Sequence, residues 1–224
     1  MKTKYLKITT IVVCLGAIPA ITFAQREVAT QNFANTTDGG PVSIQKYENI
    51  TGSPYLADDW SIGLVKLQSG KTYKEVKVKY DQVADELHFE NNGKELVFIN
   101  PIAEFKIRST NGVDLYFKNG FASDPKAFYQ VLADGKTTLI KRNRKVIVDK
   151  TPFNSATAVK VFEPQTKYYL YRDNKLDAVK NNKKSVLNAL ANKKDFLDSY
   201  IQKENIDITK DEDFGKLITY YNSL

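Results

Sequence analysis

Apolar and polar residues alternate along much of the chain, and this alternation predicts β-strands. Residues 74–80 are the clearest case, because Val76, Val78 and Tyr80 share one face while lysines occupy the other. Residues 86–90 repeat the alternation in the next segment. We therefore expect the two segments to pair as an antiparallel hairpin, with their apolar faces on the same side of the sheet.

Matching the apolar and charged faces of these two strands predicts one register. It places Tyr80 opposite Asp85, so that Lys77 lies opposite His88. A slip of one residue would turn the apolar face of one strand toward the charged face of the other, and the pattern excludes it. In this register His88 belongs to the charged, solvent-facing side of the hairpin.

Turn-forming dipeptides divide residues 43–182 into short strands, because they favour the tight or left-handed backbone geometry of hairpin turns. These dipeptides are Ser69-Gly70, Asn92-Gly93, Asn111-Gly112, Asn119-Gly120, Asp134-Gly135 and Asp173-Asn174. Further strands are expected at residues 96–99, 103–108, 113–118, 139–141, 146–148, 168–171 and 176–179. The segments 139–141 and 146–148 are interpreted as one hairpin around Asn143.

The hydrophobic period becomes helical after about residue 183. Ser185 is expected to cap a first helix, and a second is expected from about Lys194. Thr209 and Glu212 have the spacing of a capping box at the start of a third helix. Its apolar stripe consists of Phe214, Leu217, Ile218 and Tyr221.

The predicted fold class is therefore mainly β: an antiparallel meander of short hairpins, closing as a sandwich or a barrel-like sheet, with two to three C-terminal helices. Residues 43–182 form the β-rich domain. Residues 183–224 form a helical tail packed on that domain or on itself, because each apolar stripe needs a partner surface.

Residues 1–24 have the pattern of a secretory signal peptide, with a basic start, an apolar run and small residues at its end. Cleavage between Ala24 and Gln25 would leave 200 of the 224 residues and would remove Cys14, the only cysteine. The polar residues 25–42 are interpreted as a flexible leader. We therefore expect an exported protein, periplasmic or extracellular, with no transmembrane segment after signal removal.

Composition excludes several kinds of chemistry for the mature chain. Without cysteine it has no disulfide, no thiolate nucleophile and no cysteine-ligated metal. Three of the 33 basic residues and none of the 26 acidic ones lie in the predicted signal, so the mature net charge is only +4. No phosphate-binding loop and no Gly-x-Ser-x-Gly motif occurs, and no catalytic residue is assigned.

His88, the only histidine, lies between Glu86 and Glu90 on one predicted strand face. Neighbours on one face of a strand are about 7 Å apart, which is too far for these three side chains to share a metal ion. We therefore interpret them as a solvated salt-bridge face, and expect neither a metal site nor a cofactor.

Two aromatic residues near the first strand are candidates for ligand binding. Tyr55 and Trp60 have the properties of a platform for sugar rings, and the alternative is that Trp60 anchors the core. Asp58 and Asp59, which precede Trp60, are the local feature that favours a carboxylate-pair hydrolase.

One basic cluster, Lys141, Arg142, Arg144 and Lys145, is expected at a hairpin tip. Such a cluster suits an anionic lipid surface. Nucleic acid is not expected as a partner, because the aromatic residues that stack on bases do not alternate with these charges.

Several short blocks resemble a group of exported β-rich proteins of Gram-negative bacteria that have no known activity. These blocks are residues 52–56, 60–63, 78–80, 85–87, 131–136, 153–157, 168–171 and 217–224. The resemblance spans most of the mature chain and implies export through the inner membrane; it assigns no functional residue.

Two functions remain open from the sequence. The first is an exported, non-catalytic binding or structural protein of the cell envelope, whose partner is another envelope protein, a glycan or an anionic lipid surface. The alternative is a secreted glycan hydrolase that uses a carboxylate pair.

Overall fold

The computed structural model describes residues 38–121, 126–153 and 156–224. The predicted signal peptide, its cleavage site at Ala24 and Gln25, and most of the predicted leader lie outside these residues. The last part of that leader lies in the sheet, because Gly39–Pro41 already form β1 and pair with β6. Among the described residues, no helix is both long and apolar enough to cross a membrane.

The described chain is mostly β-strand, with three α-helices at its C-terminal end. The N-terminal strands are β1 (Gly39–Pro41), β2 (Ile50–Thr51), β3 (Ser61–Leu67), β4 (Thr72–Asp81), β5 (Glu86–Asn91), β6 (Lys94–Phe98), β7 (Ile102–Arg108) and β8 (Asp114–Lys118). The later strands are β9 (Tyr129–Ala133), β10 (Thr138–Lys150), β11 (Val159–Arg172) and β12 (Lys175–Val179). The helices are α1 (Lys183–Ala189), α2 (Lys194–Lys203) and α3 (Asp211–Ser223), with short 3₁₀ turns at Ile44–Tyr47 and Ala191–Lys193.

The predicted fold class, mainly antiparallel β with C-terminal helices, is confirmed. The expected closure as a sandwich or a barrel-like sheet is wrong, because the strands form one sheet that does not close. Its order is β1-β6-β5-β4-β3-β7-β8-β9-β10-β11-β12, antiparallel throughout, while β2 pairs in parallel with β11. Every predicted turn dipeptide has a residue with positive φ, at Gly70, Gly93, Gly112, Gly120, Gly135 and Asp173. The meander of hairpins was therefore readable from the turn chemistry.

The N-terminal part of the sheet curves strongly around its own side chains. Tyr80 on β4 and Phe117 on β8 have ring centroids 5.3 Å apart, although β3 and β7 lie between these strands. Three strand spacings in a flat sheet would be about 14 Å. The curvature therefore lets one layer of strands enclose a core, in which Phe105 stacks on Phe117 and is fully buried.

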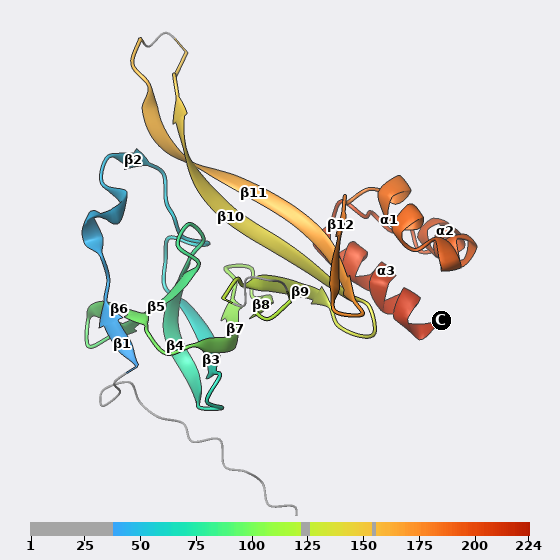
Figure 1. The fold of residues 1–224 in the computed structure, drawn as a ribbon, viewed down its shortest axis with the longest axis horizontal. Coiled ribbons are helices and arrows are strands. Elements are labelled where there is room, and N and C mark those ends of the chain that lie inside the picture. The colour runs from blue at the N-terminus through green and yellow to red at the C-terminus, as the bar shows by residue number, and fades with distance from the viewer. Residues whose placement is uncertain (1–37, 122–125, 154–155) are drawn as a thin grey trace, which may run out of the picture.

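The C-terminal part of the sheet has a second core beneath the helices (Figure 1). Leu139 and Leu170 on the sheet pack in one cluster with Phe214 and Leu217 of α3, and all four are fully buried. Asn222 near the end of α3 exchanges two hydrogen bonds with the backbone of Thr137, at 2.9 and 2.8 Å. The expected packing of the helical tail against the β-rich region is thus confirmed.

The predicted helix caps are wrong. Asn182, not Ser185, caps α1: its side chain accepts a hydrogen bond from the Ser185 N–H. The side chain of Lys210 at the start of α3 makes no capping bond, and Thr209 bonds Asp207 instead of forming a capping box. In the predicted stripe of α3, Phe214, Leu217 and Ile218 are buried and Tyr221 is partly buried.

β10 and β11 form a long ribbon that extends past the N-terminal strands (Figure 1). Residues 138–150 pair without interruption with residues 159–171. The predicted hairpin around Asn143 is therefore wrong, and the turn of the ribbon lies beyond Lys150. A single Asn without a following Gly does not enforce a turn where β-branched residues continue on both sides.

Gly215 lets α3 approach the sheet closely, because a Cβ at this position would lie 2.7 Å from the backbone oxygen of Leu132 on β9. We expect Gly215→Ala to destabilise the protein by about 1–3 kcal/mol, although alanine favours helices by up to about 1 kcal/mol. Urea unfolding followed by circular dichroism measures this effect. Ser199→Ala, at an exposed position on α2, is the control and should change stability by less than about 0.5 kcal/mol. Equal stability of Gly215→Ala and the parent would contradict the close contact.

Candidate functional site

A pocket lies on the outer face of the β4–β5 hairpin, between this hairpin and the segment 41–55 that follows β1. Its volume is about 540 Å³. The segment is fixed to the hairpin by backbone hydrogen bonds from Leu56 to Tyr80 and from Gln82 to Pro54, at 2.8 and 2.9 Å. Its other side reaches the ribbon, where β2 pairs with β11. A face that alternation alone assigns to solvent is therefore covered.

The register of the hairpin brings two acids together at its turn. Asp81 pairs with Glu86 and Lys79 with His88, which is a shift of two residues from the predicted register. A shift of two keeps the same residues on each face, so the face-matching argument does not detect it. The predicted register was wrong because it started the turn one residue early.

Asp81 sets this register by capping the turn. Its Oδ1 accepts hydrogen bonds from the N–H groups of Val83 and Ala84, at 2.8 and 2.9 Å. Its Oδ2 accepts one from the hydroxyl of Tyr47, at 2.6 Å. The side chain is almost fully buried. Burial and the Asp81 carboxylate raise the pKa of Tyr47 far above its ordinary range, so the hydroxyl remains a donor.

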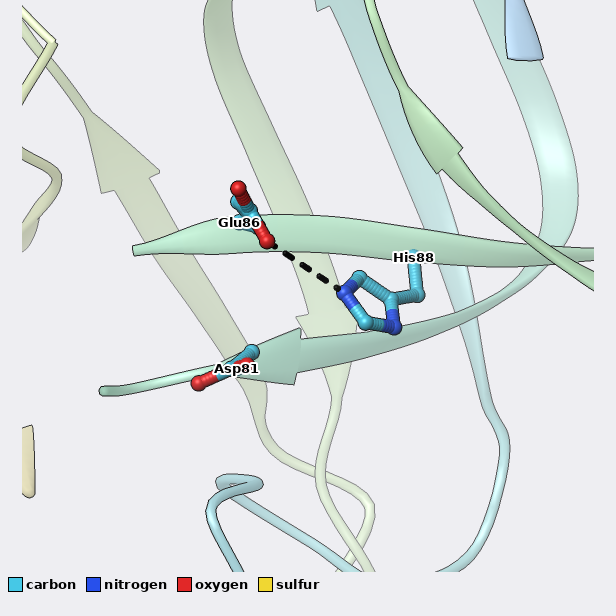
Figure 2. A group of neighbouring side chains, drawn as sticks. All are labelled: Asp81, Glu86 and His88. Atoms are coloured by element: carbon cyan, nitrogen blue, oxygen red, sulfur yellow. Dashed lines mark ion pairs between the residues drawn. The ribbon is translucent and has the colours of Figure 1, made fainter. Parts of the chain in front are cut away.

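His88 points into the pocket from β5 (Figure 2) and is only 3 % exposed. Its Nδ1 lies 2.7 Å from Oε1 of Glu95, which also accepts a hydrogen bond from the hydroxyl of Tyr55, at 3.0 Å. An ionised carboxylate only accepts hydrogen bonds, so Nδ1 carries the proton of the imidazole. Burial and Glu95 raise the pKa of Tyr55 as well, and keep it a donor.

The other ring nitrogen of His88 is unsatisfied. Nε2 is buried and has no hydrogen-bond partner within the described part of the chain. The nearest charged atom that it faces is Oε2 of Glu86, at 3.9 Å, beyond hydrogen-bond distance. An unpartnered buried polar atom costs free energy, and this one lies at the wall of the pocket.

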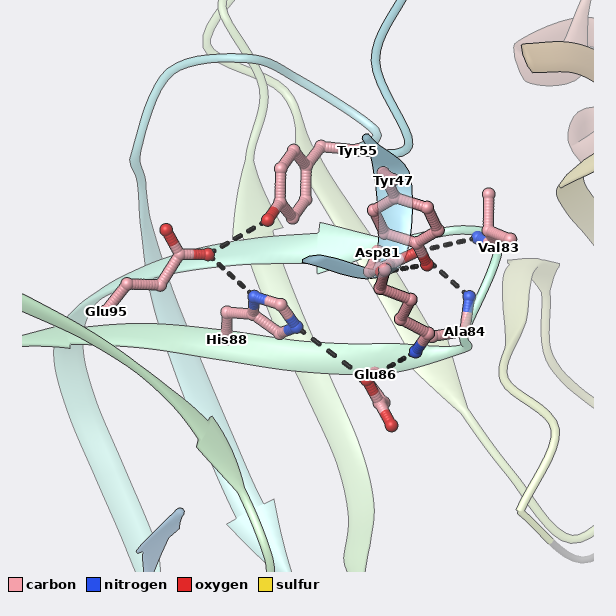
Figure 3. Close-up of polar contacts among 9 residues, drawn as sticks. Tyr47, Tyr55, Asp81, Val83, Ala84, Glu86, His88 and Glu95 are labelled. Carbon is pink, nitrogen blue, oxygen red and sulfur yellow. Dashed lines mark hydrogen bonds and ion pairs between the residues drawn. The ribbon is translucent and has the colours of Figure 1, made fainter. Parts of the chain in front are cut away.

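Glu86 forms the rim of the pocket and is half exposed. Its Oε2 lies 3.3 Å from Nζ of Lys46, and both side chains reach solvent. Figure 3 shows Glu86 and Glu95 on opposite sides of the His88 ring. Exposed ion pairs of this kind contribute about 0–1 kcal/mol, so this one is easily exchanged for another cation.

The pocket therefore combines three carboxylates, one imidazole and one lysine. Ligand atoms of Asp81, Glu86 and His88 all lie within 4.8 Å of one another, and these residues are the described group able to hold a metal ion. Glu95 lies behind His88 and orients it. The interpretation of His88 as part of a solvated face was wrong. Of the two acids beside it in sequence, Glu86 faces the pocket. Glu90 instead forms an ion pair with Lys77 and accepts a hydrogen bond from the N–H of Gly93.

Asp81, Glu95 and Tyr47 were missed from the sequence. Asp81 was hidden by the register error, because the predicted pairing placed Lys79 opposite Glu86. The short spacing between Asp81 and Glu86, with a turn between them, was the available signal. Tyr47 lies in a polar segment with no periodic pattern, and nothing local indicates that it covers β4.

Tyr55 and Trp60, the predicted aromatic platform, lie on either side of one cation. Nζ of Lys79 is 5.3 Å from the ring centroid of Tyr55 and 4.9 Å from that of Trp60. Both aromatic side chains are partly buried. Of the two, only Tyr55 lines the pocket. Its ring and the imidazole of His88 form a T-shaped pair, with ring centroids 5.6 Å apart.

The predicted basic cluster does not form one surface. Its members alternate between the two faces of β10, and three of them make intramolecular contacts. Nζ of Lys141 lies 2.6 Å from Asp211, and Nζ of Lys145 donates to the backbone oxygens of Ser53 and Tyr55. Arg142 forms an ion pair with Asp85. Arg144 is exposed, and no ion pair involves it among the described residues.

Asp58 and Asp59 are exposed and do not line the pocket. The carboxylates that converge are therefore different ones from the pair that the sequence indicates.

Comparison with protein-family models, with curated proteins and with solved structures finds no match to this chain.

Proposed function

We propose that the chain is an exported, non-catalytic binding protein of the cell envelope, and that its ligand occupies the His88 pocket. One observation carries the proposal: the buried Nε2 of His88 faces the pocket without a partner. Proteins satisfy almost all buried polar atoms, so an exception at a pocket indicates a group reserved for a ligand.

The charges of the pocket indicate a cationic ligand. Asp81, Glu86 and Glu95 face it, against the single ammonium of Lys46. An anionic ligand such as a phosphate or a lipid headgroup would meet like charges here. The basic residues of β10 give little support to binding at an anionic lipid surface, because only Arg144 among the four is free of the contacts described above.

Export is supported by the pattern of residues 1–24 and by the resemblance to exported proteins of Gram-negative bacteria. A protein without cysteine after signal cleavage also needs no oxidising compartment to fold. The mass of the protein recovered from the envelope should correspond to a chain that starts at Gln25.

The ligand class is tested by thermal unfolding of the mature chain with four probes: Zn²⁺, Ca²⁺, spermidine and inorganic phosphate. We expect at least one cationic probe to raise Tm by about 5–10 °C at a concentration one hundred times its Kd. Phosphate should leave Tm unchanged. If no cation raised Tm, or if phosphate alone did, the proposed pocket function would be wrong.

A glycan hydrolase remains the second candidate, because three carboxylates and a histidine converge on one pocket. Against it, Asp81 is almost fully buried and is held in the turn by hydrogen bonds from Val83, Ala84 and Tyr47, so its carboxylate is not free to move toward a sugar ring. Release of nitrophenol from a panel of nitrophenyl glycosides, lost in Glu86→Gln, would favour the hydrolase over the binding protein.

A further inference from the structure

We propose that the pocket binds one divalent transition-metal ion of the zinc type, with Asp81, Glu86 and His88 as its ligands. This inference rests on the proposed function and names the ligand of the same site. Both ligand strands meet at the β4–β5 turn (Figure 2), so the site is built on one rigid hairpin.

The donor atoms are close enough to converge on one ion. They lie within 4.8 Å of one another, and the Nε2 of His88 is 3.9 Å from Oε2 of Glu86. Ligands at about 2.0–2.1 Å from a tetrahedral ion are about 3.3 Å apart. The group must therefore contract by roughly 1 Å, and Glu86 can supply this movement because its side chain lies half exposed at the rim.

His88 is already prepared as a metal ligand. In the neutral imidazole, the bond from Nδ1 to Glu95 places the proton on Nδ1 and leaves the lone pair on Nε2, which faces the pocket. Histidine ligands usually donate their other N–H to a carboxylate in this way, which fixes the ring and increases its basicity. Glu95 is therefore a positioning residue.

Asp81 is fixed in a comparable manner. Its Oδ2 accepts one hydrogen bond, from Tyr47, and keeps a second lone pair for a cation. The bonds from Val83 and Ala84 hold Oδ1 in the turn, so the carboxylate does not rotate away. Tyr47 and the turn thus form the outer shell of this ligand.

The mixed donor set selects the kind of ion. Calcium and magnesium prefer sites made of oxygen alone, whereas imidazole with carboxylates suits zinc and its first-row neighbours. The ammonium of Lys46 now lies beside Glu86, and the ion would displace it. Lys46 is therefore a built-in competitor, and removing its charge should strengthen metal binding.

The experiment uses the mature chain without a polyhistidine tag and measures Zn²⁺ binding by calorimetry, with Mg²⁺ as the hard-ion comparison. We expect one Zn²⁺ per chain and no measurable Mg²⁺ binding at the same concentrations. Because His88 is the only histidine, the imidazole signals in a ¹⁵N–¹H NMR spectrum report this site alone. Zn²⁺ should shift the Nε2 resonance while Nδ1 stays protonated.

Variants separate the site from other acids of the protein. Glu86→Gln and His88→Gln should each weaken Zn²⁺ binding by 100-fold or more, and Glu95→Gln by about 10–100-fold. Lys46→Met should strengthen it by roughly three- to five-fold. Glu90→Gln is the matched control: it removes an acid two residues from His88, outside the pocket lining, and should leave Kd unchanged.

A gain in affinity with Lys46→Met cannot result from misfolding, so it keeps the test decisive even if His88→Gln folds poorly. Equal Zn²⁺ binding by the parent, Glu86→Gln and Lys46→Met, or an unshifted His88 resonance, would overturn the metal site. If spermidine or Ca²⁺ raised Tm and Zn²⁺ did not bind, the proposed cation-binding function of the pocket would hold, and the assignment of a zinc-type ion would be wrong.

Discussion

Replacing Arg142 with alanine is expected to lower the free energy of unfolding by about 3–5 kcal/mol, because it leaves a nearly buried carboxylate without its counter-ion. The guanidinium of Arg142 lies 2.6 Å from Oδ2 of Asp85, and their side chains are only 11 % and 17 % exposed. It also donates to the backbone oxygen of Phe128. One side chain on β10 thus connects the β4–β5 turn to the segment that enters β9.

Tyr80 adds to this network and shows how tightly it is enclosed. Its hydroxyl donates to Asp85 from within the N-terminal core. Burial first, and the Asp85 carboxylate second, raise the pKa of Tyr80 well above its ordinary value, so it stays a donor. Without Arg142, the Asp85 carboxylate would keep two partners among the described residues: the hydroxyl of Tyr80 and, more weakly, the N–H of Phe128.

Urea unfolding of Arg142→Ala measures the loss, and Arg144→Ala is the control on the same strand. Arg144 is exposed, so its truncation should change stability by less than about 0.5 kcal/mol. A double-mutant cycle of Arg142→Ala, Asp85→Asn and the combined variant removes each charge and then both, and should give a coupling energy of about 0.5–3 kcal/mol. Equal effects of Arg142→Ala and Arg144→Ala would show that the buried pair contributes nothing.

Phe214→Ala is the second substitution with a large expected effect, about 3–5 kcal/mol. Phe214 lies on α3 and is fully buried between this helix and the sheet. The centroid of its ring is 5.7 Å from that of Tyr168 on β11. Its removal would leave a cavity between the helix and the sheet, where surrounding strands cannot relax to fill it.

The same change at Phe196 on α2 is the matched control for Phe214→Ala. Phe196 is 56 % exposed, so its replacement should cost less than about 0.5 kcal/mol. Thermal unfolding followed by circular dichroism compares the two variants. Similar Tm values would contradict the packing of α3 on the sheet.

Elements with a strong local signal were predictable from the sequence, and those set by distant contacts were not. The hairpin turns rest on dipeptides that favour positive φ, and the stripe of α3 rests on helical period; both are local. The covering of the His88 face depends on the segment around Tyr47 and Tyr55, which returns from another part of the chain. No pattern within β5 distinguishes a histidine facing solvent from one facing such a cover.

The error at β10 has a related cause. Alternation placed strands on both sides of Asn143 correctly, but the basic residues between them suggested a turn. In the structure each of Lys141, Arg142 and Lys145 has a partner on a different element. Charges in a strand become compatible with the sheet when distant residues neutralise them, and a single sequence does not reveal these partners.

The open sheet has a further consequence for the solubility of the protein. An unclosed sheet ends in two strands whose outer backbone groups can pair with another molecule. In the described residues the ends of the sheet order are the short β1 and β12, of three and five residues. The ribbon adds longer edges, because β9 pairs with β10 only as far as Lys141, and β11 is paired on its outer side only at residues 168–172 by β12 and 160–161 by β2. Pro41 also removes one N–H donor from β1. Pairing at β1 or β12 would therefore gain only a few hydrogen bonds per contact, so a strand of another molecule would add more readily to the outer sides of the β10–β11 ribbon than to the ends of the sheet order.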